Sequence, residues 1–233
     1  TDRSRGLGDV YKRQNIGFPA KRITTQLEWE DMVLDYQVAI ELEEINVWIS
    51  SGKTVMEDWG LSRILKAGYR SLFYGSPGTG KTLAATLLGK KNEIDVYRID
   101  LSMIVSKYIG ETEKNLAKVF DLAENRNWIL FFDEADALFG KRTSTNTSND
   151  RHANQEVAYL LQRIEDFPGM VILATNLRSN IDEAFSRRFQ SVVYFPMPTE
   201  EQRAELWRNM LPGKWLGKDA EELITMAAET ELS

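Results

Sequence analysis

Short apolar runs alternate with longer segments of helical period through most of the chain. After residue 27, apolar side chains recur three or four positions apart, at Val38, Leu42, Ile45 and Ile49. This spacing predicts an amphipathic helix that packs on a core. Further along, apolar runs predict strands at 71–74, 95–99, 128–132, 171–174 and 192–195, and periodic segments predict helices at 81–89, 112–124 and 153–164. The alternation predicts a three-layer α/β/α fold with a mainly parallel sheet.

The ends of the chain differ from this pattern. Residues 1–14 are basic and aperiodic, and they resemble the translation of sequencing-adapter DNA, with a disordered tail as the alternative. We therefore assign the core to residues 15–198. After the break at Pro196 and Pro198, Thr199 predicts the cap of a helix at 200–211, so that residues 199–233 begin a separate, incomplete helical unit. Within the core, the polar stretch 140–149 predicts a mobile loop.

Composition narrows the classes of function. Hydrophobic residues make up 42% and charged residues 27% of the chain, as in ordinary globular proteins. The net charge of -6 provides no overall attraction for nucleic acid, which is therefore an unlikely partner. The absence of cysteine excludes a thiolate metal site and favours a cytoplasmic location. No apolar run reaches the roughly 20 residues of a membrane span, so none is expected.

Residues 75–82 read Gly-Ser-Pro-Gly-Thr-Gly-Lys-Thr between a predicted strand and a predicted helix, which is the context of a phosphate-binding P loop. Glycines allow backbone N–H groups to approach a phosphate, and the start of the helix adds a favourable dipole. Lys81 is expected to bridge the β- and γ-phosphates of ATP, and the Thr82 hydroxyl to bind Mg²⁺. The predicted nucleotide-binding residues are Gly75, Pro77, Gly78, Thr79, Gly80, Lys81, Thr82, Leu83 and Asp133.

An acidic pair follows the buried run 129–132. Asp133 and Glu134 stand at the carboxyl end of this strand, where ligands bind in open parallel sheets. We expect Asp133 to hold Mg²⁺ through water, together with Thr82, and Glu134 to act as the base for the attacking water. Alone, the pair is only moderately specific, and a solvated acidic turn is the alternative. Its combination with the P loop favours a nucleotide-hydrolysing site.

From about Leu27 to Ser233 the chain resembles the AAA ATPases, in their bacterial form. Besides the P loop and the acidic pair, residues 174–176 (Ala-Thr-Asn) resemble the sensor strand of that family. The resemblance implies that Asn176 orients the hydrolytic water. Residues 181–189 resemble the segment that supplies arginine fingers to the neighbouring subunit, which would be Arg187 and Arg188; a solvated arginine pair is the alternative.

The stretch Lys107, Tyr108, Ile109 and Gly110 resembles the pore loop with which ring-forming members of the family grip a polypeptide. Burial of Tyr108 and Ile109 in the domain's own core is the alternative. Residues 140–151 fall where the family has a second pore loop. The family's helical lid carries a second sensor residue beyond a stretch like 230–233, and an amino-terminal domain selects the substrate. Both are expected to lie outside this sequence.

The resemblance implies an ATPase that unfolds, threads or dismantles proteins as a homo-oligomeric ring, a hexamer above all, with ATP and Mg²⁺ as cofactors. A nucleic-acid motor or loader, and an ATP-dependent scaffold with little turnover, remain alternatives. The acidic composition and the 107–111 segment favour a protein substrate over nucleic acid. The presence of both Glu134 and Asn176 disfavours a scaffold.

Overall fold

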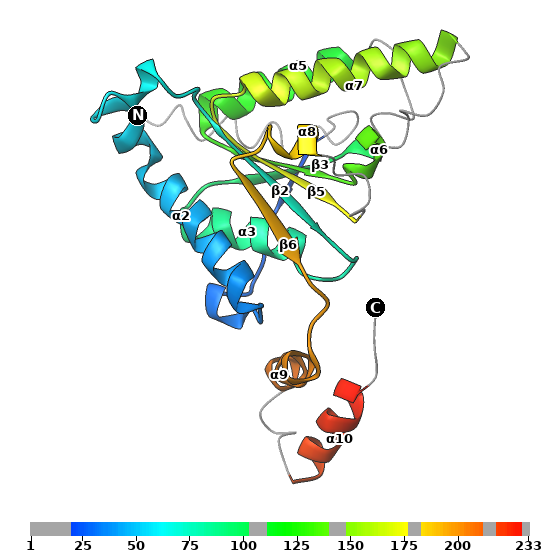
Figure 1. The fold of residues 1–233 in the computed structure, drawn as a ribbon. Coiled ribbons are helices and arrows are strands. Elements are labelled where there is room, and N and C mark those ends of the chain that lie inside the picture. Colours follow the sequence, from blue (N-terminus) through cyan, green and yellow to red (C-terminus); the bar gives the residue numbers. More distant parts are fainter. Residues whose placement is uncertain (1–19, 103–110, 140–147, 177–182, 212–217, 230–233) are drawn as a thin grey trace, which may run out of the picture.

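The computed structural model describes residues 20–102, 111–139, 148–176, 183–211 and 218–229 (Figure 1). These residues form one six-stranded sheet, with the strand order β1-β3-β4-β5-β2-β6. The strands are β1 (Ala20–Ile23), β2 (Tyr69–Gly75), β3 (Val96–Asp100), β4 (Ile129–Asp133), β5 (Met170–Thr175) and β6 (Ser191–Phe195). All neighbours pair in parallel except β1, which runs antiparallel to β3. The predicted mainly parallel sheet is confirmed.

Helices cover both faces of this sheet (Figure 1). On one face lie α2 (Tyr36–Glu57) and α3 (Lys81–Lys91), and on the other lie α5 (Glu111–Arg126) and α7 (Ser148–Asp166). Shorter elements connect them: η1 (Trp29–Asp31), η2 (Leu61–Arg63), α6 (Asp136–Phe139) and α8 (Glu183–Ser186). The three predicted layers are thus present, and each predicted core helix and strand is found within a few residues of its expected bounds.

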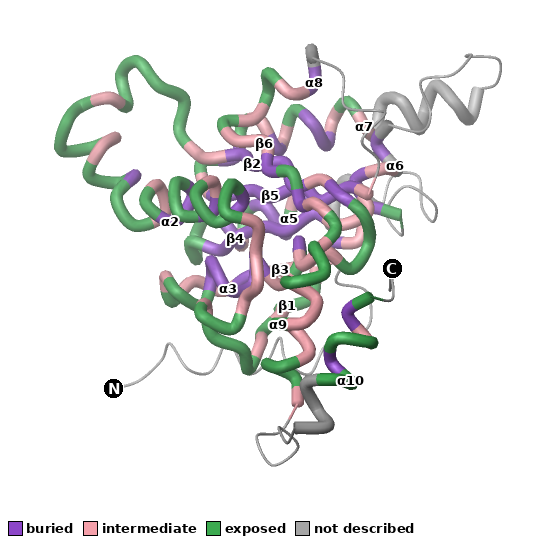
Figure 2. Tube along the Cα trace, turned by 60° about the horizontal axis from the view of Figure 1, so that its bottom comes forward, coloured by how far each residue is buried: buried purple, intermediate pink, exposed green. Residues whose placement is uncertain are grey.

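Each face of the sheet has its own hydrophobic core. Along β4, Ile129 and Phe131 pack with α2 and α3, whereas Leu130 and Phe132 pack with α5 and α7. All four side chains are fully buried, which explains why this strand is a continuous apolar run and not an alternating one. Figure 2 shows the same burial throughout the central strands. The sheet is therefore a rigid platform whose carboxyl edge presents the connecting loops.

Two features differ from the sequence predictions. Strand β1 was not predicted, because Lys21 and Arg22 interrupt its short apolar pattern; it is held by pairing with β3 and by an ion pair of 2.6 Å between Arg22 and Asp95. Helix α7 begins at Ser148, so the loop expected at 140–151 is wrong for residues 148–151. Serine, asparagine and aspartate favour the first turn of a helix as well as loops, and the polar pattern did not separate the two. Residues 140–147 and 1–14 lie outside the described part.

Two further helices, α9 (Glu200–Met210) and α10 (Lys218–Glu229), pack on each other beyond β6 (Figure 1). As predicted, Thr199 caps α9: its hydroxyl accepts the N–H of Gln202, and the Gln202 side chain accepts the N–H of Thr199. Arg203 joins the pair, because its guanidinium donates to the carbonyls of Pro198 at 2.7 Å and Ala228 at 2.6 Å. Among the described residues, no helix combines the length and apolar character that a membrane crossing requires.

Candidate functional site

The P loop connects β2 to α3, as predicted. Gly78 and Gly80 have φ angles of 78° and 95°, in the left-handed region that glycine adopts without strain. A Cβ atom built on either residue meets no other atom within 4 Å, so the space beside the loop is open. Helix α3 begins at the next residue, Lys81. The loop therefore offers a glycine-lined concavity at a helix N-terminus, which is a favourable place for a phosphate.

Lys81, the first residue of α3, is only 7% exposed. Its Nζ atom donates to the carbonyls of Gly75 and Ser76, both at 2.8 Å. Burial lowers the pKa of the Lys81 ammonium, whereas the charges of Asp133, Asp136 and Glu134 oppose this shift. Strand β2, which leads into the P loop, and strand β4, which ends in the acidic pair, flank β5 in the sheet and run parallel to it, so both features lie at the same edge. Thr82, the predicted metal ligand, follows with an exposed side chain.

At the end of β4 both oxygens of the Asp133 carboxylate are engaged. Oδ1 accepts the backbone N–H of Glu134 at 3.0 Å, and Oδ2 forms an ion pair with Nη2 of Arg98 at 2.8 Å. The Asp133 side chain is 16% exposed, so the carboxylate is largely shielded from solvent and yet open on one side. Sequence reasoning missed Arg98. A charged residue two positions before Asp100 in a predicted strand was the available signal.

Glu134 has a left-handed backbone, with φ at 56°. Among the described residues, two other non-glycine positions share this region, Glu93 and Asn127. Asn127 directly follows α5, and Glu93 lies two residues after the end of α3. A left-handed backbone is common just after a helix. Glu134 instead follows a strand, and such strained positions cluster at functional sites. Burial raises the pKa of its carboxyl group, as do the charges of Asp133, Asp136 and Asp100, while Arg98 lowers it. The carboxyl group thus tends to hold a proton more firmly than an ordinary glutamate.

Strand β5 lies between β4 and β2, so its carboxyl end is between the acidic pair and the P loop. Asn176, the predicted sensor, is half-buried directly after this strand. The preceding Thr175 donates its hydroxyl to Asp136, and Ala135 donates its N–H to Ala174 at 2.9 Å. These contacts tie the turn after Glu134 to β5. Asp136 and Thr175 were missed by sequence reasoning, although the spacing of Asp133 and Asp136 offered a signal.

Arg187 and Arg188 follow α8 and have exposed side chains. Phe185, just before them, is buried in the core beneath α5 and α7, on the face of the sheet opposite α3. Arg188 also forms an ion pair with Glu165, near the end of α7. The structure therefore does not bring this pair together with Lys81 of the same chain. The predicted pore-loop residues Lys107, Tyr108, Ile109 and Gly110 lie outside the described residues.

A cavity of about 290 Å³ adjoins the P loop on the side away from β4. The segment before α2, the P loop and α9 all contribute to its walls, through Met32, Val33, Leu34, Gly78, Thr79, Gly80, Leu83, Leu206 and Met210 among others. Pro77 and Trp207 line a neighbouring cavity. An apolar cavity next to a phosphate-binding loop suits the base of a nucleotide. Sequence reasoning missed the residues before α2, although the apolar run 32–34 could have indicated them.

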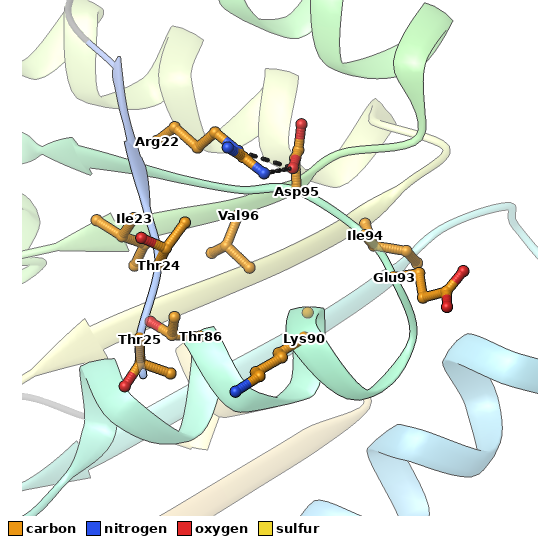
Figure 3. Close-up of a pocket in the computed structure, with 11 residues that line it drawn as sticks. Arg22, Ile23, Thr24, Thr25, Thr86, Lys90, Glu93, Ile94, Asp95 and Val96 are labelled. Atoms are coloured by element: carbon orange, nitrogen blue, oxygen red, sulfur yellow. Dashed lines mark hydrogen bonds and ion pairs between the residues drawn. The ribbon is translucent and has the colours of Figure 1, made fainter. Parts of the chain in front are cut away.

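A second cavity lies between β1, α3 and β3 (Figure 3). Three of its charged side chains have partners: Arg22 pairs with Asp95, and Lys90 donates to Glu28 at 2.7 Å and to the Leu27 carbonyl at 2.8 Å. These contacts join β1 and the segment after it to α3 and the start of β3, and no phosphate-binding loop is among the described residues that line the cavity. We therefore assign the candidate site to the P loop and the acidic end of β4.

Comparison with known proteins gives the relatives of this chain. Residues 71–197 match the sequence model of the ATPase family associated with various cellular activities (AAA). Cell division protein C of Sulfolobus acidocaldarius is 42% identical over 146 residues, covering 58% of this chain and 38% of that protein. A proteasome-activating nucleotidase of Archaeoglobus fulgidus is 38% identical over 144 residues, covering 59% of this chain and 36% of its own length.

Vacuolar protein sorting-associated protein 4B of Mus musculus is 37% identical over 141 residues, covering 59% of this chain and 32% of that protein. The chain thus spans well under half the length of these relatives. Among solved structures, the FIGL-1 AAA domain superposes with a TM-score of 0.68 at 24% identity, over 94% of this chain and 71% of that one. This likeness confirms the predicted P-loop α/β fold.

Proposed function

The chain belongs to the ATPase family associated with various cellular activities (AAA), and we propose that it uses ATP hydrolysis to unfold, thread or dismantle proteins. The observation that carries this proposal is the grouping of Lys81, Asp133 and Glu134 at the carboxyl edge of the sheet. A cation for phosphate, a carboxylate for metal and a second carboxylate for water are the groups that nucleotide hydrolysis requires. A cytoplasmic location is part of this proposal.

The residues of the site suit ATP and Mg²⁺. Gly78 and Gly80 leave open space beside the loop for phosphate. The Lys81 ammonium is held at the start of the same loop by the carbonyls of Gly75 and Ser76. The Thr82 hydroxyl and the Asp133 carboxylate are hard oxygen ligands of the kind that Mg²⁺ binds together with phosphates and water. We propose that Thr82 holds the ion and that Asp133 does so through water. Bound there, Mg²⁺ would neutralise charge on the β- and γ-phosphates.

Each remaining residue has a role in hydrolysis under this proposal. The Glu134 carboxylate accepts the proton of the attacking water, and its raised pKa brings it closer to neutrality, where a general base is most effective. Asn176, between the acidic pair and the P loop, orients that water. Lys81 binds the β- and γ-phosphates. The bacterial type of the family, the roles of single residues and the domain limits stay predictions.

We propose that Arg187 and Arg188 act on ATP bound by the next subunit of a homo-oligomeric ring, and that this ring is a hexamer. Support comes from their exposure and from Phe185, which anchors their segment on the face opposite α3. The ion pair between Arg188 and Glu165 has to rearrange for Arg188 to reach a neighbouring subunit. A guanidinium supplied in trans stabilises negative charge that develops on the γ-phosphate.

The proposed substrate class is supported by the names of two relatives and by one sequence stretch. Two relatives carry names that connect them with the proteasome and with protein sorting: proteasome-activating nucleotidase and vacuolar protein sorting-associated protein 4B. We propose that the pore-loop stretch 107–110 grips an extended polypeptide, with the Tyr108 ring in contact with the chain. Because a nucleic-acid motor is the alternative, the test has to separate a protein substrate from nucleic acid.

The test measures ATP hydrolysis by the full-length protein with an unfolded protein or single-stranded DNA added. We expect the unfolded protein to raise the rate and DNA to leave it unchanged. Stimulation by DNA alone would favour a nucleic-acid motor, and slow turnover under every condition would favour a scaffold. Tyr108→Ala should abolish unfolding of a tagged substrate. The control is Tyr36→Ala, which removes an 80% exposed tyrosine from α2 and should preserve unfolding.

A further inference from the structure

Arg98 on β3 faces the carboxylate at the end of β4. The two strands are parallel neighbours, with Arg98 opposite Phe131 and Asp100 opposite Asp133. Since side chains two positions apart share a face of a sheet, Arg98, Asp100 and Asp133 lie on the same side. The Arg98 side chain therefore extends along this face toward the carboxyl edge, where its Nη2 atom contacts Asp133 Oδ2 at 2.8 Å.

The neighbouring charges make Arg98 the direct counter-ion of Asp133. Lys81, the other cation that influences this site, donates to two carbonyls of the P loop. Asp100 accepts from the backbone and hydroxyl of Ser102, at 3.0 and 2.6 Å. Furthermore, the Nε atom of Arg98 is buried without a hydrogen-bond partner in the described part of the chain. The contact with Asp133 is therefore a principal anchor of the guanidinium.

The two contacts of Asp133 restrict the rotation of its carboxylate. That group turns easily about its last bond, because this torsion has broad minima. Here Arg98 contacts Oδ2 and the Glu134 N–H donates to Oδ1, which fixes the plane of the carboxylate. Each oxygen keeps a second lone pair that can still accept a contact. Partners of this kind, which orient a metal-holding group without touching the metal, commonly affect metal affinity by tenfold or more.

We propose that Arg98 is a positioning residue that orients the Asp133 carboxylate for Mg²⁺. This inference rests on the proposed role of Asp133 in holding the metal. The same ion pair could instead oppose the metal, since a guanidinium on Asp133 competes with a cation for the carboxylate. The two roles have opposite signs: loss of a positioning residue weakens Mg²⁺-dependent binding, and loss of a competitor strengthens it.

The experiment compares dissociation constants for a non-hydrolysable ATP analogue, measured by calorimetry with Mg²⁺ and with EDTA. The dissociation constant in EDTA, divided by the constant with Mg²⁺, reports how much the metal strengthens nucleotide binding, independently of turnover. For Arg98→Gln we expect this ratio to fall about tenfold. Arg98→Lys keeps the charge and should restore part of it. The control is Arg22→Gln, which removes the Arg22–Asp95 ion pair on the other side of β3 (Figure 3) and should leave the ratio unchanged.

Two results would overturn the inference: an unchanged ratio in Arg98→Gln, or a higher ratio. An unchanged ratio that accompanies an equal loss of affinity with Mg²⁺ and with EDTA would indicate a general effect of charge on the nucleotide. Asp133→Asn separates this inference from the function on which it rests. If Asp133→Asn lowers the ratio and Arg98→Gln does not, only the role of Arg98 fails. If neither does, Asp133 itself does not serve the metal. Melting curves of Arg98→Gln and Arg98→Lys establish that folded proteins are compared.

Discussion

Substitution of two glycines in one loop should separate folding from nucleotide binding. Gly75 ends β2 opposite Phe195 of β6, and an added Cβ would lie 2.1 Å from the Phe195 carbonyl oxygen. Relief of this overlap requires the strands to move apart by more than about 1 Å, because ordinary contacts begin near 3.5 Å. Overpacking of this kind costs about 1 to 3 kcal/mol. An alanine at the positive φ of Gly75, 149°, adds backbone strain of about the same size. We expect Gly75→Ala to destabilise the protein by about 3 kcal/mol.

Gly78→Ala is the matched comparison, since Gly78 also has a positive φ but open space around its Cα. It should lose only about 1 kcal/mol, from backbone strain. For a domain of this size, these values correspond to melting temperatures about 9 °C and about 3 °C below the parent, measured by circular dichroism. In calorimetry, Gly78→Ala should nevertheless weaken ATP binding, because its methyl group enters the space proposed for phosphate. Equal melting temperatures for the two variants would refute the reasoning.

Three further predictions concern the chemistry. Lys81→Ala should weaken ATP binding about a hundredfold, because a hydrogen-bonded cation is lost; an unchanged dissociation constant in calorimetry would contradict its role. Glu134→Gln should bind Mg²⁺-ATP but hydrolyse it about a thousandfold more slowly, whereas turnover near the parent rate would place the base elsewhere. In the full-length protein, a chain with Arg187→Ala and Arg188→Ala, mixed with Glu134→Gln chains, should regain part of the ATPase activity. If the two chains assemble together and no activity returns, action in trans is wrong.

The sequence predicts most of the fold because burial on both faces leaves a strong signal. Strands such as β4 and β5 are continuous apolar runs, and α2 carries its buried side chains at helical spacing. Where tertiary contacts decide the structure, the signal is weak. Strand β1 is held by backbone pairing with β3, and half of its four residues are charged. The start of α7 is polar, so that its first residues read equally well as a loop.

The candidate site divides in the same way. Lys81, Asp133 and Glu134 are identified by motif, because their chemistry needs particular residues at fixed places in the chain. Arg98 contacts the end of the neighbouring strand β4, and Thr175 contacts Asp136 at the start of α6, just after β4. Such contacts depend on strand order and register, which a single sequence does not specify. The cavity beside the P loop is another such case: its walls come from segments more than a hundred residues apart.

Arg203 has a consequence for how movement passes through this molecule. Its guanidinium donates to Pro198, on the segment that leaves the sheet, and to Ala228, near the end of α10. A displacement of residue 198 can therefore reach residue 228 through the Arg203 guanidinium, and not only along the chain that connects the two residues. Since α9 also borders the cavity beside the P loop and packs on α10, a ligand in that cavity would adjoin a pair of helices that is already joined by Arg203.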